Sequence, residues 1–192
     1  MFRLAILIYL MMFGLVSERV RGGESTNIDD DYCVALFTGS GEENPFWVLF
    51  VDFMSAAAND LGIQLEVFYA DGSRNRMQLQ IREVCQRADK PDCIVFQSFK
   101  KIGARILRLC QRYDMPVFLV NSGLTDEQEE RLGGPRAKLS SWIGEMLPDD
   151  EGAGYKLANA LIDEAKKDPR RLGTDGRVHV IGLNGVVSHD AS

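Results

Sequence analysis

Short apolar runs along this chain alternate with longer stretches in which apolar residues recur every three or four positions. Runs of four to six residues are typical of strands buried in a parallel sheet, and the longer stretches have the spacing of amphipathic helices. We therefore predict an α/β fold in which right-handed βαβ units place helices on both faces of a parallel sheet. The predicted strands are 33–37, 64–69, 93–96 and 117–120, and the predicted helices are 45–61, 74–88 and 100–113.

The first predicted helix has well-defined ends. Asn44 is a preferred N-cap, Pro45 suits the first helical position, and Gly62 suits the left-handed conformation that ends a helix. A loop of small residues, 38–41, connects this helix to the first strand. The loop and the first helical turn, which contains Phe46 and Trp47, then lie at the carboxyl end of the strand, where open α/β sheets bind ligands.

The pattern is less regular after residue 122. Residues 124–138 are polar, charged and interrupted by Gly and Pro, so we expect an exposed connection with a short helical turn at most. A short strand at 141–144 and a helix at 150–166 follow, and 177–183 is predicted to be a fifth main strand. The apolar stripe that the last helix is expected to bury consists of Ala153, Leu157, Leu161 and Ala165.

The N-terminus has the pattern of a secretory signal. Arg3 precedes an apolar run at 4–16, which would reach roughly 20 Å as a helix and so is short of the roughly 30 Å hydrocarbon core. We predict that 1–22 is a signal peptide, that 23–32 is a linker, and that the protein is exported to the periplasm. An uncleaved N-terminal anchor is the alternative.

Composition argues against several functions. A net charge of −6 disfavours nucleic acid, which needs a clustered basic face. The cysteines match no metal motif, His179 and His189 have no second ligand nearby, and no G-x-S-x-G elbow is present. A dinucleotide site at the 39–41 loop, with Asp71 on a ribose, would lack its third glycine, because Asn44 stands there. We expect no metal, no cofactor and no enzymatic activity; a secreted α/β enzyme is the weaker alternative.

Polar residues follow several strands of the predicted sheet directly. Because the carboxyl ends of parallel strands meet at one edge, these residues should lie close together. Amides and hydroxyls beside aromatic rings suit a sugar, whose C–H faces stack on rings while its hydroxyls form hydrogen bonds. The alternative is that the aromatic pair packs under the loop and the amides only cap helices. The candidate ligand-binding residues are Asn44, Phe46, Trp47, Gln97, Ser98, Asn121, Ser122 and Asp190.

Four motifs resemble the type I periplasmic solute-binding proteins, in particular the ribose- and autoinducer-2-binding branch. They are NPFW at 44–47, IVFQS at 94–98, MPVFLVN at 115–121 and VIGLNG at 180–185. The resemblance implies a two-lobed α/β protein that binds a small solute as a monomer, either for an ABC importer or for a membrane sensor kinase. The residues that it implies contact ligand are Asn44, Phe46, Trp47, Gln97, Asn121 and Ser122.

The chain departs from that family in two respects. Pentose-binding members carry an acid and an arginine where this chain has Asn121 and Ser122, so we expect a neutral, hydroxyl-rich ligand that stacks on Trp47. The sequence also ends at Ser192, before a ligand-gripping arginine of the family would appear. We therefore expect a first lobe at 33–122, only the start of a second lobe at 123–192, and weak or absent binding by this chain alone.

The four cysteines lie in predicted strands and helices. If the strand order is 2-1-3-4, right-handed crossovers place the helices at 74–88 and 100–113 side by side and parallel. Cys85 and Cys110 then lie at the same height and are a candidate disulfide in an oxidising compartment, with two free buried thiols as the alternative. Cys33 and Cys93 are expected to be small buried residues of strands.

Overall fold

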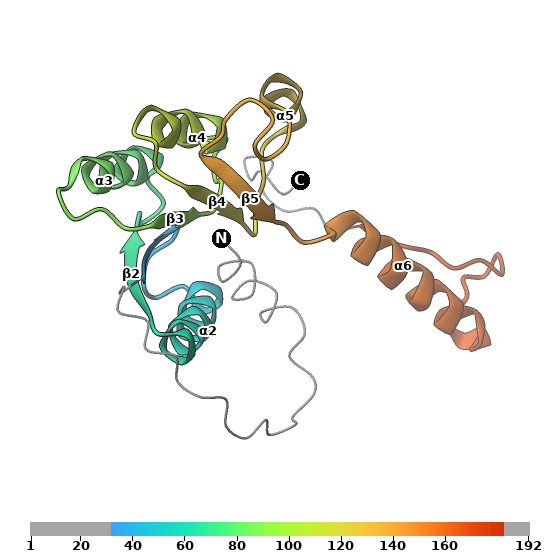
Figure 1. Ribbon diagram of the computed structural model, residues 1–192. Coiled ribbons are helices and arrows are strands. Elements are labelled where there is room, and N and C mark those ends of the chain that lie inside the picture. The colour runs from blue at the N-terminus through green and yellow to red at the C-terminus, as the bar shows by residue number, and fades with distance from the viewer. Residues whose placement is uncertain (1–31, 183–192) are drawn as a thin grey trace.

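A computed structural model describes residues 32–182 of the 192-residue chain. It contains a five-stranded parallel sheet with the strand order β2-β1-β3-β4-β5 (Figure 1). The first four strands have the order 2-1-3-4, which is the condition on which the expected side-by-side placement of the helices with Cys85 and Cys110 depended. The strands are β1 (Tyr32–Thr38), β2 (Ile63–Tyr69), β3 (Cys93–Phe96), β4 (Val117–Val120) and β5 (Trp142–Met146).

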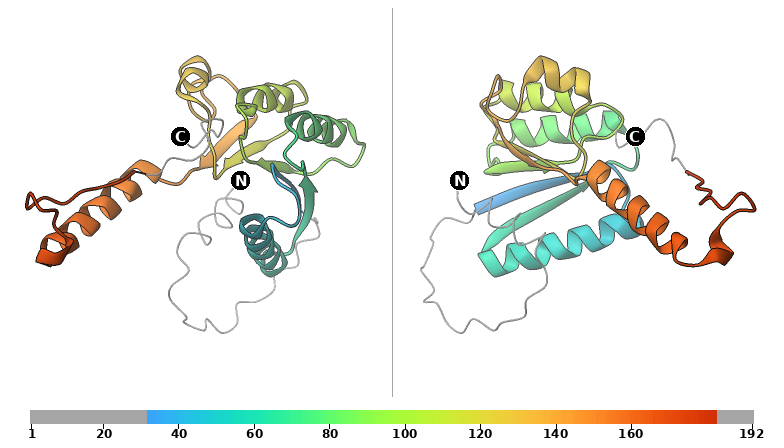
Figure 2. Two further views of the ribbon diagram at one scale, coloured as in Figure 1. Left: turned by 180° about the vertical axis from the view of Figure 1, so that it is seen from behind. Right: turned by 90° about the vertical axis from the view of Figure 1, so that its right-hand side faces the viewer.

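Helices cover both faces of this sheet, as predicted. One long helix lies on one face and three helices lie on the other (Figures 1 and 2). The first is α2 (Pro45–Leu61), and the other three are α3 (Arg74–Gln86), α4 (Gly103–Arg112) and α5 (Asp126–Leu132).

The sheet is buried because its side chains point alternately to the two helical layers. In β1, Val34 and Leu36 pack with Met54 of α2, whereas Ala35 and Phe37 pack in the layer of α3 and α4. All four of these β1 residues are fully buried. Strands covered on both faces read as continuous apolar runs, which explains why the sequence showed them clearly.

The ends of α2 lie where its sequence predicted them. The Asn44 side-chain oxygen accepts a hydrogen bond from the Phe46 N–H at 3.1 Å, and Pro45 occupies the first turn. At the other end Gly62 is left-handed, with φ of 66°. These local signals determine that α2 begins at Pro45, directly after the loop that follows β1, so Phe46 and Trp47 belong to its first turn.

The structure differs from the sequence-based expectations between β4 and residue 146. Here α5 is a helix of seven residues and so exceeds the short turn expected within 124–138. The short strand is β5, which pairs with β4 in the same sheet. The first sheet therefore continues past the lobe boundary that we placed at 122/123, and the division of the chain into two lobes stays a prediction.

The predicted helix at 150–166 is present as α6 (Asp150–Lys166), but its predicted burial is wrong. Leu157 and Leu161 are 61% and 62% exposed, and Ala153 is exposed too. The apolar stripe indicates which face can be buried, but here residues 178–182 only line an open hollow together with Leu157 and Leu161. A turn of 3-10 helix, η1 (Pro169–Arg171), follows α6.

The fifth main strand predicted at 177–183 is also wrong as far as the structure describes it, because residues 177–182 form no strand. The predicted signal peptide, most of the linker and Asp190 lie outside the described residues. Within 32–182, no helix is both long and apolar enough to cross a bilayer.

Candidate ligand-binding site

A cavity of about 620 Å³ lies at the carboxyl end of the sheet, between the segments that follow β1, β3 and β4. It brings together every candidate binding residue of the described part of the chain. Asp190 lies outside that part, so its role stays a prediction. The cavity is lined by Gly39, Ser40, Asn44, Phe46, Trp47, Gly72, Gln97, Ser98, Phe99, Lys100, Asn121 and Ser122.

Two of these segments are tied together by hydrogen bonds. The Ser98 N–H donates to the Ser122 carbonyl oxygen at 3.1 Å, and the Asn121 amide donates to the Gln97 side-chain oxygen at 3.5 Å. Asn121 is left-handed, with φ of 66°, a conformation that Asn tolerates better than most residues because its short polar side chain can bond locally. The polar side chains after β3 and β4 thus form one continuous wall.

The two aromatic residues of the first helical turn have different environments. Trp47 is only 5% exposed and packs edge-on against Phe46 and Phe50, with ring centroids 5.1 and 5.2 Å away. Phe46 is 53% exposed. Trp47 therefore lines the cavity as part of the packed helix, and the ring open to a ligand is that of Phe46.

Two further candidate polar residues also have structural partners. Besides capping α2, Asn44 donates from its amide to the Ser40 hydroxyl at 3.4 Å. The Ser98 hydroxyl accepts from the Gly103 N–H at the start of α4, at 3.2 Å. The capping role considered for the amides is therefore present at Asn44, and contact of Asn44 or Ser98 with a ligand stays a prediction.

Five further residues line this cavity and were not among the candidates predicted from the sequence. They extend the predicted segments by a few positions, so counting every residue between a strand end and the next helix would have found most of them. Gly72 is the exception, because it arrives from the turn after β2. The five are Gly39, Ser40, Gly72, Phe99 and Lys100.

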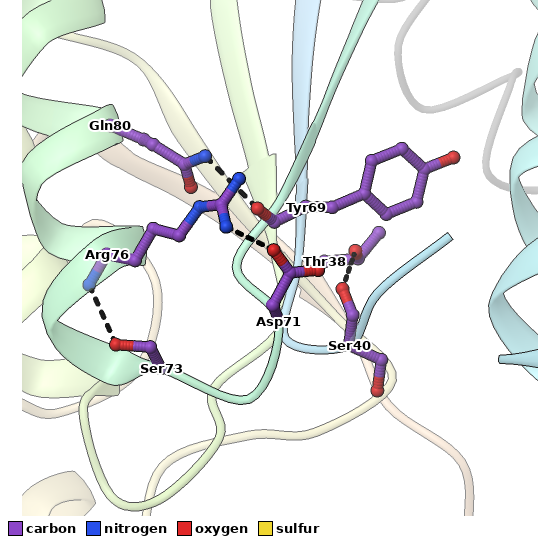
Figure 3. A network of polar contacts seen from close by, with 7 residues as sticks. All are labelled: Thr38, Ser40, Tyr69, Asp71, Ser73, Arg76 and Gln80. Carbon is purple, nitrogen blue, oxygen red and sulfur yellow. Dashed lines mark hydrogen bonds and ion pairs between the residues drawn. The ribbon is translucent and has the colours of Figure 1, made fainter. Parts of the chain in front are cut away.

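The turn after β2 supports the loop after β1. The Gly72 N–H donates to the Gly39 carbonyl oxygen at 2.8 Å, and the Thr38 hydroxyl donates to the Ser40 carbonyl oxygen at 3.1 Å. Arg76 forms an ion pair with Asp71 in this network (Figure 3). The carboxylate that a dinucleotide site would need for a ribose is thus paired with an arginine, and Asp71 is not among the residues that line the cavity.

No group of three or more His, Cys, Asp or Glu side chains in residues 32–182 is arranged to hold a metal ion. Cys85 and Cys110, in contrast, lie side by side. Both are fully buried free thiols between α3 and α4. The hydrogen bond between them lowers the pKa of Cys85 below its ordinary value, although burial acts in the opposite direction. The same hydrogen bond and burial together raise the pKa of Cys110 well above its ordinary value.

We predict that oxidation joins Cys85 to Cys110. Their thiols are already in contact, and closing a loop of this size would stabilise the fold by about 3 kcal/mol. The measurement is mass spectrometry of the oxidised protein, alkylated while unfolded and without reductant. Cys93 should be labelled as an internal control, because burial raises its pKa to about 12 and keeps it unreactive until unfolding. Labelling of Cys85 and Cys110 in the same sample would show that the bond does not form.

Known proteins resemble this chain in sequence and in fold. Residues 34–178 match the family model of periplasmic binding proteins and the sugar-binding domain of the LacI family. A periplasmic sugar-binding protein from Pseudomonas fluorescens is 35% identical, with a TM-score of 0.58. The match covers 72% of this chain and 38% of the length of that protein. A search among curated proteins found no match.

Two more distant structures share the fold. One is a galactofuranose-binding protein, which is 17% identical with a TM-score of 0.59 over 82% of this chain and 47% of its own. The other is an ABC transporter solute-binding protein from Actinobacillus succinogenes with bound D-allose, which is 16% identical. Its TM-score is 0.58, and the match covers 71% of this chain and 45% of that protein. The chain spans less than half the length of all three structures.

The family match covers most of the described residues, and the fold agrees with it. The strand order, the helices on both faces and the cavity at the carboxyl end of the sheet are all those of an α/β binding domain. This chain therefore belongs to the family of periplasmic binding proteins and LacI-type sugar-binding domains.

Proposed function

We propose that this chain is an exported solute-binding protein that captures a small hydroxylated ligand, a sugar, for an ABC importer. The observation that carries the proposal is the cavity at the carboxyl end of the sheet that brings the candidate residues together. The segments that follow β1, β3 and β4 contribute the exposed ring of Phe46 and the amides of Gln97 and Asn121 to this cavity. They also contribute the hydroxyls of Ser40 and Ser122. This combination suits the C–H faces and the hydroxyls of a sugar ring.

The wall formed by Gln97, Asn121 and Ser122 is uncharged. Each amide both donates and accepts hydrogen bonds, as a sugar hydroxyl does, and so can pair with hydroxyls in either sense. Gln97 is 7% exposed and is already held by Asn121, which reduces the side-chain entropy lost when a ligand binds. The ligand is therefore expected to present neutral hydroxyls to this wall.

Delivery to an importer is proposed from the relatives. The structures named above are described as a sugar-binding protein, a galactofuranose-binding protein and an ABC transporter solute-binding protein. We propose that residues 1–22 direct export to the periplasm and that the protein meets a membrane permease as a monomer. Solute-binding domains that close by hinge bending hold a ligand from two sides. Because the described residues form only one wall, we expect weak binding, and the assays should extend to millimolar sugar.

The test is sugar binding with and without the Phe46 ring. Saturation-transfer NMR on the chain with a panel of hexoses and pentoses should detect binding, and Phe46→Ala should weaken it by about 1–3 kcal/mol because a stacking face is lost. Leu49→Ala is the matched control, since Leu49 is 72% exposed on the same helix but does not line the cavity. Equal affinities for Phe46→Ala and the unmodified chain would contradict the proposed stacking.

A further inference from the structure

Lys100 is the only charged residue among the described residues that line the cavity. It follows Gln97, Ser98 and Phe99 in the segment between β3 and α4. Its ammonium group lies 5.8 Å from the centroid of the Phe99 ring and donates a hydrogen bond to the Gly72 carbonyl oxygen. This places a positive charge in the wall of the proposed sugar site.

That charge is not neutralised by a carboxylate of the described residues. Lys100 forms no ion pair among them, and Asp71, next to Gly72 in the chain, is paired with Arg76 (Figure 3). Glu42 and Glu43 line a separate hollow with Asp71 and Arg76. An ammonium group has three donors, so Lys100 can hold the Gly72 carbonyl and still donate to a ligand.

The backbone at this position is also unusual. Lys100 and Lys101 have φ of 49° and 60°, the left-handed region that glycine or asparagine adopts most readily. Each such residue costs roughly 1–2 kcal/mol. A lysine side chain is thus presented to the cavity from a turn whose backbone would favour glycine.

We propose that Lys100 makes the cavity selective for an acidic sugar, a hydroxylated ring that carries one carboxylate. The proposal rests on the proposed function of sugar capture and changes the ligand expected from the sequence, which was neutral throughout. The ring hydroxyls would meet the uncharged wall of Gln97, Asn121 and Ser122. The carboxylate would accept a charge-assisted hydrogen bond from Lys100, which is stronger than a bond between neutral groups.

The test compares matched pairs of sugars on the purified chain: glucose with glucuronate, and galactose with galacturonate. Measured by NMR titration at low salt, at least one acid should bind about 10-fold more tightly than its neutral partner. Lys100→Gln should reduce the difference within that pair to about 2-fold or less, and Lys100→Arg should retain most of it. Added salt should reduce the preference of the unmodified chain.

Lys101→Gln is the matched control, because it removes the same charge at the next residue, whose side chain does not line the cavity. It should leave the preference unchanged; an equal loss in both variants would mean a general charge effect and overturn the inference. Neutral sugars that bind as well as the acids would also overturn it but leave sugar capture intact. If none of the four sugars binds, both the inference and the proposed function fail.

Discussion

Trp47→Ala is expected to lower the free energy of unfolding by about 3–5 kcal/mol, whereas Phe46→Ala at the neighbouring position should change it little. The two residues are consecutive in the first turn of α2, but Trp47 is 5% exposed and Phe46 is 53% exposed. Removing the indole leaves a cavity beside Phe50, because the surrounding helix can relax only partly. Urea unfolding followed by circular dichroism measures both variants.

For sugar affinity we expect the opposite order, with a larger effect from the loss of the Phe46 ring than from the loss of the Trp47 indole. Phe46→Ala should act on binding alone. Trp47→Phe, which keeps most of the packing, should retain more stability than Trp47→Ala and so isolate the contribution of the indole to binding. From the sequence we expected stacking on Trp47. A large loss of affinity in Trp47→Phe, with unchanged stability, would restore that expectation and contradict the assignment of the open face to Phe46.

Gly39→Ala is expected to weaken sugar binding by about 10-fold or more and to destabilise the fold by about 1–3 kcal/mol. A Cβ atom at this position would collide with the Gln97 amide and come within 2.9 Å of the Phe99 ring. The amide can swing away because it ends a flexible side chain, but it then leaves the wall that it forms with Asn121. The ring has less freedom, which accounts for the loss of stability.

Gly134→Ala is the matched control for this substitution. A Cβ atom at Gly134 meets no other atom within 4 Å, so this variant should match the unmodified chain in both affinity and stability. Calorimetric titration and thermal unfolding of the two variants measure the effects. Unchanged binding in Gly39→Ala would mean that Gln97 does not need its present position and is not a ligand contact.

The sheet and its helices could be predicted from the sequence because their signals are local. Strands buried on both faces appear as apolar runs, and Asn44, Pro45 and Gly62 specify the ends of α2 through capping. The site could be predicted in outline for a topological reason, since parallel strands bring their carboxyl ends together. This is why Gln97 and Asn121, 24 residues apart in the chain, lie within hydrogen-bonding distance.

What could not be predicted depends on which segments pack together in space. The apolar spacing of α6 indicates a face that can be buried, but not whether another segment covers Leu157 and Leu161. Similarly, Phe46 and Trp47 are both aromatic and adjacent in sequence, so only their orientation on α2 distinguishes them. The position of Lys100 depends on a left-handed turn at two lysines, which no propensity would favour.

The positions of the two tryptophans also have a spectroscopic consequence. Trp142 is 1% exposed within the core between the sheet and its helices, and its indole N–H has no hydrogen-bond partner in the described structure. Trp47 is the other tryptophan of the chain and lines the cavity. A solute that enters the cavity would therefore change the emission of Trp47 and leave that of Trp142 constant, so the protein carries its own fluorescent reporter of occupancy.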